Sequence, residues 1–216
     1  MKSINSQTNL QIFDCKIVSL NIRSLKKHID DLKKEPVIAR ADVLMVQQTC
    51  LSDFEDVEGY QIDNYRSHFN SFGDGKGIAI YFLDNFDLVC DISVENYQIS
   101  KIQSTKYDLI CVYRSTDTCK TNQIKFLNDL HSLLNIKRQT FILGDFNFDA
   151  LLPEKNLILK ELQNWNFKQI VEKATHIKGG LIDHCYISDN INPLSVIVNQ
   201  KSVYYTDHDI IPVFVT

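Results

Sequence analysis

A carboxylate and a carboxamide stand two positions apart at Asp145 and Asn147, directly after the apolar run 141–143 and Gly144. The run predicts a buried strand, and side chains two positions apart in extended backbone point to the same side. A carboxylate there can accept a proton from water, and an amide can donate hydrogen bonds to a phosphate. Because Asp, Asn and Gly are also ordinary turn residues, the pair needs support from elsewhere in the chain.

Similar polar signals follow other apolar runs of the sequence. They are Asn21, Gln48, Tyr113 with Arg114, and Asp183 together with Asp207 and His208. Polar residues just beyond the carboxyl ends of strands are expected where one edge of a sheet forms an active-site rim. Each signal also has a plainer interpretation, Tyr113 as a core aromatic and Asn21 as a turn or cap residue. Asp207 and His208 fit a solvated loop equally well.

The elements that must position these residues are predicted from hydrophobic periodicity. Apolar and β-branched runs predict ten strands, at 16–20, 42–46, 77–82, 87–94, 97–104, 107–113, 141–143, 181–187, 194–198 and 210–215. Apolar residues at helical spacing predict helices at 25–34, 121–134 and 154–163. Ser24 is the expected N-cap of the first helix, and Pro36 lies beyond its end.

Strands interrupted by helices in both halves of the chain indicate two sheets packed face to face, with helices on the outside. The predicted fold is therefore a four-layer α/β sandwich of two mainly antiparallel β-sheets. The chain has 216 residues, which suits one domain with a sizeable core. Residues 11–216 are assigned to that domain and residues 1–10 to a flexible lead-in.

Composition excludes some classes of protein and leaves others open. Hydrophobic residues at 44% and charged residues at 23% are typical of a globular domain, and no apolar run is long enough to span a membrane. Six cysteines without a C-x-x-C pair argue for reduced thiols, against a zinc site and against a disulfide framework. The formal charge of −4 does not decide about a nucleic-acid partner, because a bound cation offsets the carboxylates of a metal-dependent nuclease.

Six separated segments carry a family resemblance and occur in the order in which the family has them. They are 19–23, 46–51, 112–114, 143–147, 181–184 and 206–208. With them the chain resembles the endonuclease/exonuclease/phosphatase family, and within it the apurinic-like endonuclease domains of non-LTR retrotransposons and related mobile elements. The resemblance implies a deoxyribonuclease I-like fold, which agrees with the sandwich predicted from the strand pattern.

The resemblance also implies a role for each matching residue. His208 would stabilise or protonate charge at the scissile phosphate, and Asp183 would hold the imidazole in the required tautomer. Asp145 would align and deprotonate the attacking water. Asn147 would hold a phosphate oxygen, and Tyr113 would hydrogen-bond the phosphate or the leaving oxygen.

A hard cation, Mg²⁺ or alternatively Mn²⁺, would lie among oxygen ligands from Asn21, residue 48 and Asp207. The sequence departs from the family pattern here, because the family has a metal-binding glutamate where this chain has Gln48. The neutral amide leads us to expect substrate binding with slow or no cleavage. Gln48 is the one departure from an otherwise intact set of site residues, and glutamine has the shape of glutamate. Deliberate substitution of the residue therefore explains Gln48 better than natural loss of activity does. His176 and His184 have no implied role and are interpreted as structural or surface residues.

The implied activity is metal-dependent nicking of DNA to leave a 3′-hydroxyl, by the endonuclease domain of a retrotransposon or other mobile element. Alternatives with the same fold are an abasic-site repair enzyme and a tyrosyl-DNA phosphodiesterase, and a different class is a catalytically decayed DNA-binding module. Candidate DNA contacts next to the motifs, which serve solubility equally well, are Arg23, Lys26, Arg114 and Lys178. We further expect a nuclear location, no membrane contact, and other domains in a longer polyprotein, such as a reverse transcriptase.

Overall fold

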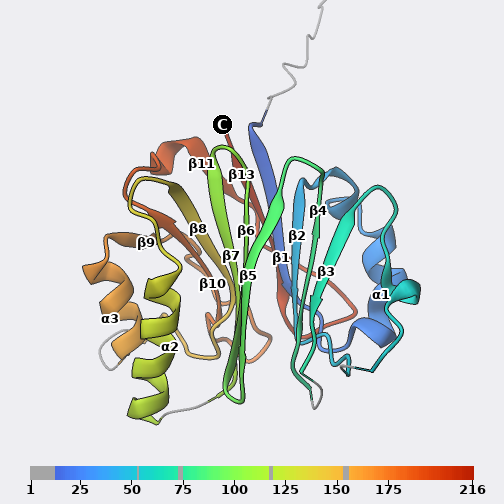
Figure 1. Cartoon of the computed structure of the whole chain (residues 1–216), viewed down its shortest axis with the longest axis horizontal. Helices are drawn as coiled ribbons and strands as arrows, with labels where there is room; N and C mark the ends of the chain where they lie inside the picture. Colours follow the sequence, from blue (N-terminus) through green and yellow to red (C-terminus); the bar gives the residue numbers. More distant parts are fainter. Residues whose placement is uncertain (1–12, 53, 73–74, 117–118, 153–155) are drawn as a thin grey trace, which may run out of the picture.

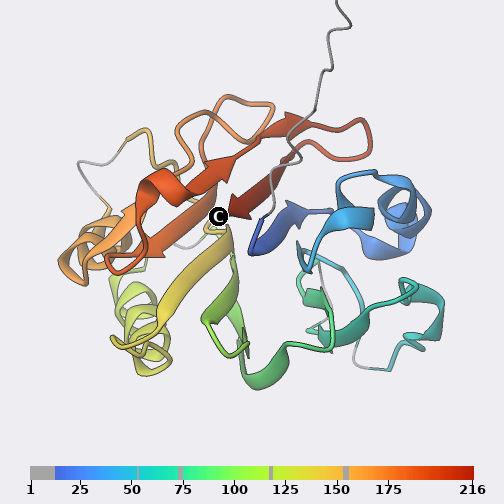
Figure 2. The ribbon, with the colours of Figure 1, turned by 90° about the horizontal axis from the view of Figure 1, so that it is seen from above.

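Two β-sheets pack face to face, and helices lie against their outer sides (Figures 1 and 2). The computed structural model describes residues 13–52, 54–72, 75–116, 119–152 and 156–216. The lead-in expected at residues 1–10 lies outside the described residues.

The first sheet, sheet A, is built around a parallel pair of strands. Its strands are β1 (Cys15–Asn21), β2 (Val43–Gln47), β3 (Arg66–Asn70), β4 (Ile78–Phe82), β11 (Val196–Val198), β12 (Lys201–Ser202) and β13 (Asp209–Val215). They are arranged in the order β11-β13-β1-β2-β4-β3, with β12 paired to β13. Only β1 and β2 pair in parallel among these described strands, and helix α1 (Leu25–Lys34) connects them.

The second sheet, sheet B, repeats this plan. Its strands are β5 (Asp87–Val94), β6 (Tyr97–Gln103), β7 (Tyr107–Arg114), β8 (Gln139–Asp145), β9 (Phe167–Gln169) and β10 (Asp183–Ser188), in the order β5-β6-β7-β8-β10-β9. The strands β7 and β8 are parallel and joined through helix α2 (Lys120–Ser132). Helix α3 (Leu157–Asn164) precedes β9, and short 3₁₀ helices lie at Ile38–Arg40, Glu58–Tyr60 and Pro193–Ser195.

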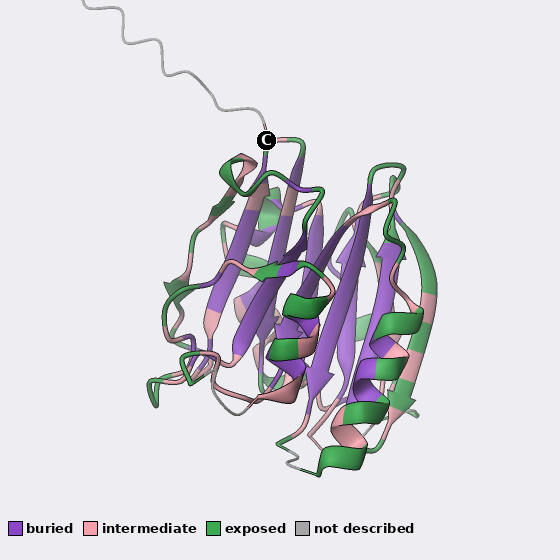
Figure 3. Cartoon of the chain, turned by 90° about the vertical axis from the view of Figure 1, so that its left-hand side faces the viewer, coloured by how far each residue is buried: buried purple, intermediate pink, exposed green. Residues whose placement is uncertain are grey.

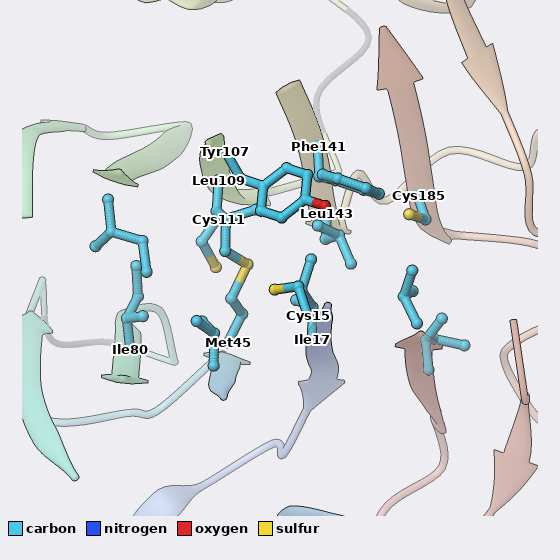
Figure 4. Close-up of a cluster of buried hydrophobic side chains, with 14 of the residues drawn as sticks. Cys15, Ile17, Met45, Ile80, Tyr107, Leu109, Cys111, Phe141, Leu143 and Cys185 are labelled. Atoms are coloured by element: carbon cyan, nitrogen blue, oxygen red, sulfur yellow. The ribbon is translucent and has the colours of Figure 1, made fainter. Parts of the chain in front are cut away.

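The apolar core lies in three layers. Between the sheets, Met45 and Ile80 of sheet A belong to one buried cluster with Leu109 of sheet B (Figure 4). Leu32 of α1 is buried against the outer face of sheet A, and Phe126 of α2 against that of sheet B. Figure 3 shows the buried strands behind helices whose outward faces are exposed. The predicted four-layer sandwich of mainly antiparallel sheets is confirmed.

The observed elements differ from the predicted ones mainly where the chain is exposed. Strand β3 was not predicted, because it is an edge strand whose first four residues are exposed or half-buried and do not alternate clearly. The strand predicted at 194–198 is shorter, since Pro193 begins a 3₁₀ turn that ends at Ser195. Ser24 occupies the N-cap position of α1, but its side chain makes no capping hydrogen bond. Positions 154 and 155 of the third predicted helix lie outside the described residues.

Close contact between β7 and β8 depends on Gly144. Its φ of +140° is in a region that favours glycine, and a Cβ atom there would lie 1.9 Å from the carbonyl oxygen of Val112. The next position along β8 is Asp145, so the glycine brings a carboxylate to the end of the closely packed pair. Within the described ranges, no helix combines the length and apolar character needed to cross a membrane.

Candidate active site

Strand pairing places Asp145 between two other polar residues of sheet B. Its partner on β7 is Tyr113, and its partner on β10 is Asp183. His208 reaches the same place from the segment before β13 of sheet A. Ligand-type atoms of Asp145, Asp183 and His208 lie within 4.8 Å of one another, and all three residues are buried. Residues from distant parts of the chain thus form one polar group.

His208 and Asp183 form a buried pair. The His208 Nδ1 atom lies 2.8 Å from Asp183 Oδ2 and 3.1 Å from Oδ1, and both side chains are at most 3% exposed. A carboxylate only accepts, so Nδ1 carries the proton. Burial lowers the pKa of His208, but the hydrogen bond and charge of Asp183, with the charges of Asp145 and Asp207, outweigh it and raise the pKa overall. The imidazolium favoured by this pair is the form that stabilises anionic charge.

Asp145 is a buried carboxyl group held by three donors. Asn21 Nδ2 donates to Oδ2 at 2.7 Å, and Asn147 donates from its backbone N–H to Oδ1 at 2.9 Å and from Nδ2 to Oδ2 at 3.0 Å. Burial, followed by the charge of Asp183, raises the pKa of Asp145 to about 7. A carboxylate with such a pKa is suited to accept a proton near neutral pH.

Asn147 turns the chain after β8 and fixes Asp145. Its backbone has a φ of +50°, and its Nδ2 atom donates to the carbonyl of Arg114 at 2.7 Å as well as to Asp145. Both amide protons are therefore engaged within the protein. The expected contact between Asn147 and a phosphate oxygen stays a prediction.

Arg114 lies differently from expectation. The residue is only 4% exposed, and its guanidinium donates to the carbonyl of Phe146 at 3.0 Å. The side chain thus supports the turn that carries Asp145 and Asn147. The DNA contact expected for Arg114 stays a prediction, and the contact that the structure shows is the one with Phe146.

Tyr113 lies beside Asp145 with its hydroxyl 3.4 Å from the carbonyl oxygen of Gly75. Burial, followed by the charge of Asp145, raises the pKa of Tyr113 to about 12. The phenol therefore remains protonated and can donate a hydrogen bond, as its predicted role at the phosphate requires.

Sheet A contributes two neutral amides at the ends of its parallel strands. Asn21 donates through Nδ2 to Gln48 Oε1 at 3.0 Å as well as to Asp145, and its Oδ1 accepts the backbone N–H of Arg23 at 3.0 Å. These partners fix the orientation of the Asn21 amide, since Arg23 requires an acceptor and Asp145 a donor. Gln48 must then turn its oxygen to Asn21, which leaves its NH₂ group without a hydrogen-bond partner among the described residues.

Asp207 carries an oxygen that suits a cation. Its Oδ2 lies 3.3 Å from His176 Nε2. Its Oδ1 is buried, lies 3.6 Å from Arg23 Nε, and has no hydrogen-bond partner among the described residues. Burial raises the pKa of Asp207, but the charges of Arg23, His208 and His176 outweigh it and lower the pKa overall. Asp207 is therefore ionised.

The donor set fits a hard divalent cation. Asp207 offers an unpartnered carboxylate oxygen, and the mutual repulsion of Asp145 and Asp183 is the kind of charge that a cation offsets. Oxygen donors of this type bind Mg²⁺ or Mn²⁺. Gln48 is the poorest ligand of this set, because it has an NH₂ group where a glutamate would have a second oxygen.

The three other candidate DNA contacts are at the surface. Arg23 is half exposed and lies next to Asp207. Lys26 is exposed and pairs with Glu55 at 3.0 Å, and Lys178 is exposed in the turn before β10. Their contacts with DNA stay predictions.

The sequence patterns did not single out two residues that hold the site together. Thr175 accepts the backbone N–H groups of Ile182 at 3.1 Å and of Asp183 at 2.9 Å through Oγ1. His176 contacts Asp207 from the next position. Their only sequence signal is their place shortly before the Asp183 motif, which is too general to identify a role. His184, by contrast, is a core residue stacked on Phe146, and burial lowers the pKa of His184 to about 4.

The fold and this polar group agree with one protein family. The sequence model of the Endonuclease/Exonuclease/phosphatase family matches residues 18–208. The chain belongs to this family of nucleases and phosphatases, as the six segments predicted. No curated protein sequence matches the chain significantly.

Solved structures with the same fold include several enzymes of nucleic acids. The endonuclease domain of TRAS1, a telomere-specific non-LTR retrotransposon, matches with a TM-score of 0.69 and 15% identity, over 93% of this chain and 97% of that one. An AP endonuclease from Archaeoglobus fulgidus has a TM-score of 0.72 and 13% identity, over 93% and 99%. The 3′ phosphatase NExo from Neisseria, bound to product DNA hairpin, has a TM-score of 0.69 and 16% identity, over 94% and 99%. At these identities the comparisons establish the shared fold.

Proposed function

We propose that this chain is a metal-dependent endonuclease that nicks DNA and leaves a 3′-hydroxyl, and that it serves a retrotransposon or other mobile element. The observation that carries the proposal is the buried group of Asp145, Asp183 and His208, which combines a proton acceptor with an oriented imidazole. The structural likeness to the TRAS1 endonuclease domain supports the assignment to a mobile element.

In the proposed reaction Asp145 accepts a proton from the attacking water, whose oxygen forms the new bond to phosphorus. The raised pKa of Asp145, about 7, suits this transfer near neutral pH. Asn21 and Asn147 hold the carboxylate by hydrogen bonds and so fix the direction from which water is taken. The bond from phosphorus to the 3′ oxygen then breaks, and that oxygen takes up a proton from the His208 imidazolium or from water, which leaves a 3′-hydroxyl and a 5′-phosphate.

His208 and Tyr113 stabilise the charge that develops on the phosphate and on the leaving oxygen. Asp183 fixes the Nδ1–H tautomer of His208, so that Nε2 is the ring atom available to the phosphate. The protonated phenol of Tyr113 supplies a further donor. Asp207 and Asn21, together with a glutamate at position 48, would hold Mg²⁺ or Mn²⁺, which would neutralise charge on the phosphate.

Gln48 weakens this enzyme through its hydrogen bonding as well as its lost charge. The Asn21 amide is fixed by Arg23 and Asp145, so the oxygen of Gln48 is committed to Asn21. Its NH₂ group cannot bind a cation. We therefore propose that the chain binds its substrate and cleaves it slowly or not at all.

The test is cleavage of supercoiled plasmid, an abasic duplex, a single strand and a tyrosyl-DNA adduct, side by side, with Mg²⁺ and with EDTA. We expect the Gln48→Glu variant to nick plasmid at least about 10-fold faster than the Gln48 chain, with 3′-hydroxyl ends and no cleavage in EDTA. The mobile-element assignment is contradicted if only the abasic duplex is cut, which would favour a repair enzyme. Cleavage of a tyrosyl-DNA adduct alone would favour a tyrosyl-DNA phosphodiesterase.

A second candidate is a DNA-binding module that has lost catalysis, which the neutral residue at position 48 favours. DNA binding by the Gln48 chain and by Gln48→Glu, without any nicking by Gln48→Glu, would support the DNA-binding module and contradict the endonuclease.

We further propose that residues 11–216 form one endonuclease domain and that this domain works in the nucleus. Its partners besides DNA are other domains of a longer polyprotein, such as a reverse transcriptase.

A further inference from the structure

A short turn before β10 is fastened to the segment that carries Asp207 and His208. The turn closes with hydrogen bonds from Gly179 N to the carbonyl of His176 at 2.8 Å and from His176 N to that of Gly180 at 3.1 Å. On either side of His176, the backbone is joined to the other segment by Ile177 N to Asp207 O at 3.0 Å and Asp209 N to Thr175 O at 2.7 Å. His176 is thereby held beside Asp207 by backbone bonds alone.

The same turn determines which nitrogen of His176 carries the proton. The backbone N–H of Lys178 donates to His176 Nδ1 at 3.1 Å. A backbone amide can only donate, so Nδ1 is an acceptor and the proton of the neutral ring is on Nε2. That Nε2 atom lies 3.3 Å from Asp207 Oδ2, and the His176 side chain is only 11% exposed. The ring therefore presents a donor to Asp207.

The other oxygen of Asp207 faces the candidate active site. Its Oδ1 lies 3.6 Å from Arg23 Nε and 3.9 Å from His208 Nε2. This atom is buried and has no hydrogen-bond partner among the described residues. Oδ2 lies next to His176 Nε2 at 3.3 Å, so the two oxygens of Asp207 have different surroundings.

Coordination of a metal by His176 itself is a different possibility, since His176, Asp207 and His208 offer atoms within 4.8 Å of one another. A neutral histidine that binds a metal through Nε2 must carry its proton on Nδ1. The Lys178 N–H already points at that atom, so the two donors would oppose each other. The local hydrogen bonding therefore favours His176 as a donor and disfavours it as a ligand.

We propose that His176 is a positioning residue, which holds Asp207 through Nε2–H so that Oδ1 faces the cation and phosphate. The inference rests on the proposed function, because it assigns a task to Asp207 in that same site. Residues that orient a ligating carboxylate change metal affinity by about 10–100-fold when they are lost.

Two substitutions separate the hydrogen bond that His176 accepts from Lys178 and the 3.3 Å contact of its Nε2 atom with Asp207. The oxygen of asparagine reaches the place of Nδ1, so His176→Asn keeps the acceptor for Lys178 and loses the donor to Asp207. The nitrogen of glutamine reaches the place of Nε2, so His176→Gln keeps that donor. Both are made in the Gln48→Glu protein, and Mn²⁺ affinity is measured by calorimetry and by the loss of the free Mn²⁺ signal in electron paramagnetic resonance. Thermal unfolding in EDTA verifies that both variants fold.

We expect His176→Asn to weaken Mn²⁺ binding by about 10-fold or more and His176→Gln to recover most of it. In the unsubstituted chain, long-range ¹H–¹⁵N spectra of the neutral His176 ring should show the Nε2–H tautomer. Equal Mn²⁺ affinity for the Asn variant and its parent, no recovery by Gln, or an Nδ1–H tautomer would each overturn the proposal.

The result also distinguishes this inference from the proposed function. If the Gln48→Glu parent binds Mn²⁺ without nicking DNA, the endonuclease proposal fails, and the comparison of the two His176 variants still decides the role of His176. If the parent nicks DNA and His176→Asn binds Mn²⁺ equally well, only the positioning role fails. If the parent binds no Mn²⁺, both proposals fall.

Discussion

The two sheets are built on the same plan but end in different chemistry. In sheet A a helix joins the parallel strands β1 and β2, and in sheet B a helix joins the parallel strands β7 and β8. The sheet A pair ends in Asn21 and Gln48, both neutral amides. The sheet B pair ends in Tyr113 and Asp145, with Asp183 on the adjacent strand. Negative charge is therefore concentrated at the end of sheet B, while the sheet A strands provide hydrogen-bond donors.

This difference shows what residue 48 changes. Asn21 reaches across from sheet A to donate to Asp145, so the contact between the halves is intact. The proton acceptor and the oriented imidazole, formed by Asp145, Asp183 and His208, are also complete. What the β1–β2 pair of sheet A lacks is a carboxylate for a cation. The comparison separates the groups that perform proton transfer from those that hold the metal.

The largest expected effect on activity is that of removing the carboxylate at the end of β8 in sheet B. Asp145→Asn, made in the Gln48→Glu protein, removes the proton acceptor and keeps its shape. We expect nicking at saturating Mg²⁺ to fall by about 10²–10⁴-fold, measured as initial rates on supercoiled plasmid. The exposed Asp189→Asn is the matched control and should leave the rate unchanged. A loss of less than about 10-fold for Asp145→Asn would exclude it as the base.

The tight pairing of β7 with β8 should be the more fragile of the two parallel pairs. In Gly144→Ala the added Cβ would meet the carbonyl of Val112 at 1.9 Å, and the φ of +140° disfavours any side chain. We expect the free energy of unfolding to fall by about 3 kcal/mol or more. Gly59→Ala, with no atom within 4 Å of the added group, should change it by less than about 0.5 kcal/mol. Urea unfolding measures both, and similar values would show that the close approach is not needed.

Loss of stability at low pH should also arise mainly from sheet B, whose strand β10 contains His184. Burial lowers the pKa of His184 from 6.5 to about 4. Between those values the unfolded chain binds a proton that the folded chain does not, so stability falls as the pH falls. The loss is at most about 3 kcal/mol. Urea midpoints of the wild-type chain and His184→Gln at pH 7, 5.5 and 4 test this. An equal decline in the two proteins would show that His184 is not its cause.

The smallest expected effect is that of a single surface charge on DNA binding. Lys178 is exposed in the turn beside His176, whereas Lys137 is exposed near the start of β8, away from its end at Asp145. Loss of one phosphate contact in Lys178→Ala should reduce the slope of log affinity against log salt by about 1. Lys137→Ala should leave the slope unchanged. Fluorescence anisotropy with a labelled duplex measures both, and equal slopes would place the DNA elsewhere.

The sequence predicted most of the fold because buried strands are short, apolar runs. The bounds of α1 and β5 agree with the predicted 25–34 and 87–94, and each strand that carries a candidate residue was recognised. Strand β3 escaped because an edge strand with exposed side chains lacks that signal. Its pairing with β4 depends on backbone groups, which leave no pattern in the sequence.

The site was predictable to the extent that its residues lie at one end or the other of a strand, since Asp145 ends β8, Asp183 begins β10 and His208 precedes β13. Asp145, Asp183 and His208 converge because strand pairing brings such ends together. The roles of Arg114 and His176 depend on the residues that they contact in the folded chain, which lie far from them in the sequence. Arg114 bonds a carbonyl 32 positions away, and His176 contacts Asp207 through a turn whose shape its sequence does not reveal. Burial and hydrogen-bond partners of this kind require the folded structure.

The Mn²⁺ affinity of the Gln48 chain and of Gln48→Glu, titrated side by side, tests most directly that position 48 lacks the carboxylate that a cation needs. We expect the glutamate variant to bind at least about 10-fold more tightly, because a charged carboxylate with two oxygens replaces an amide whose one oxygen accepts from Asn21. Equal affinities would contradict this view, since residue 48 would then lie outside the metal site.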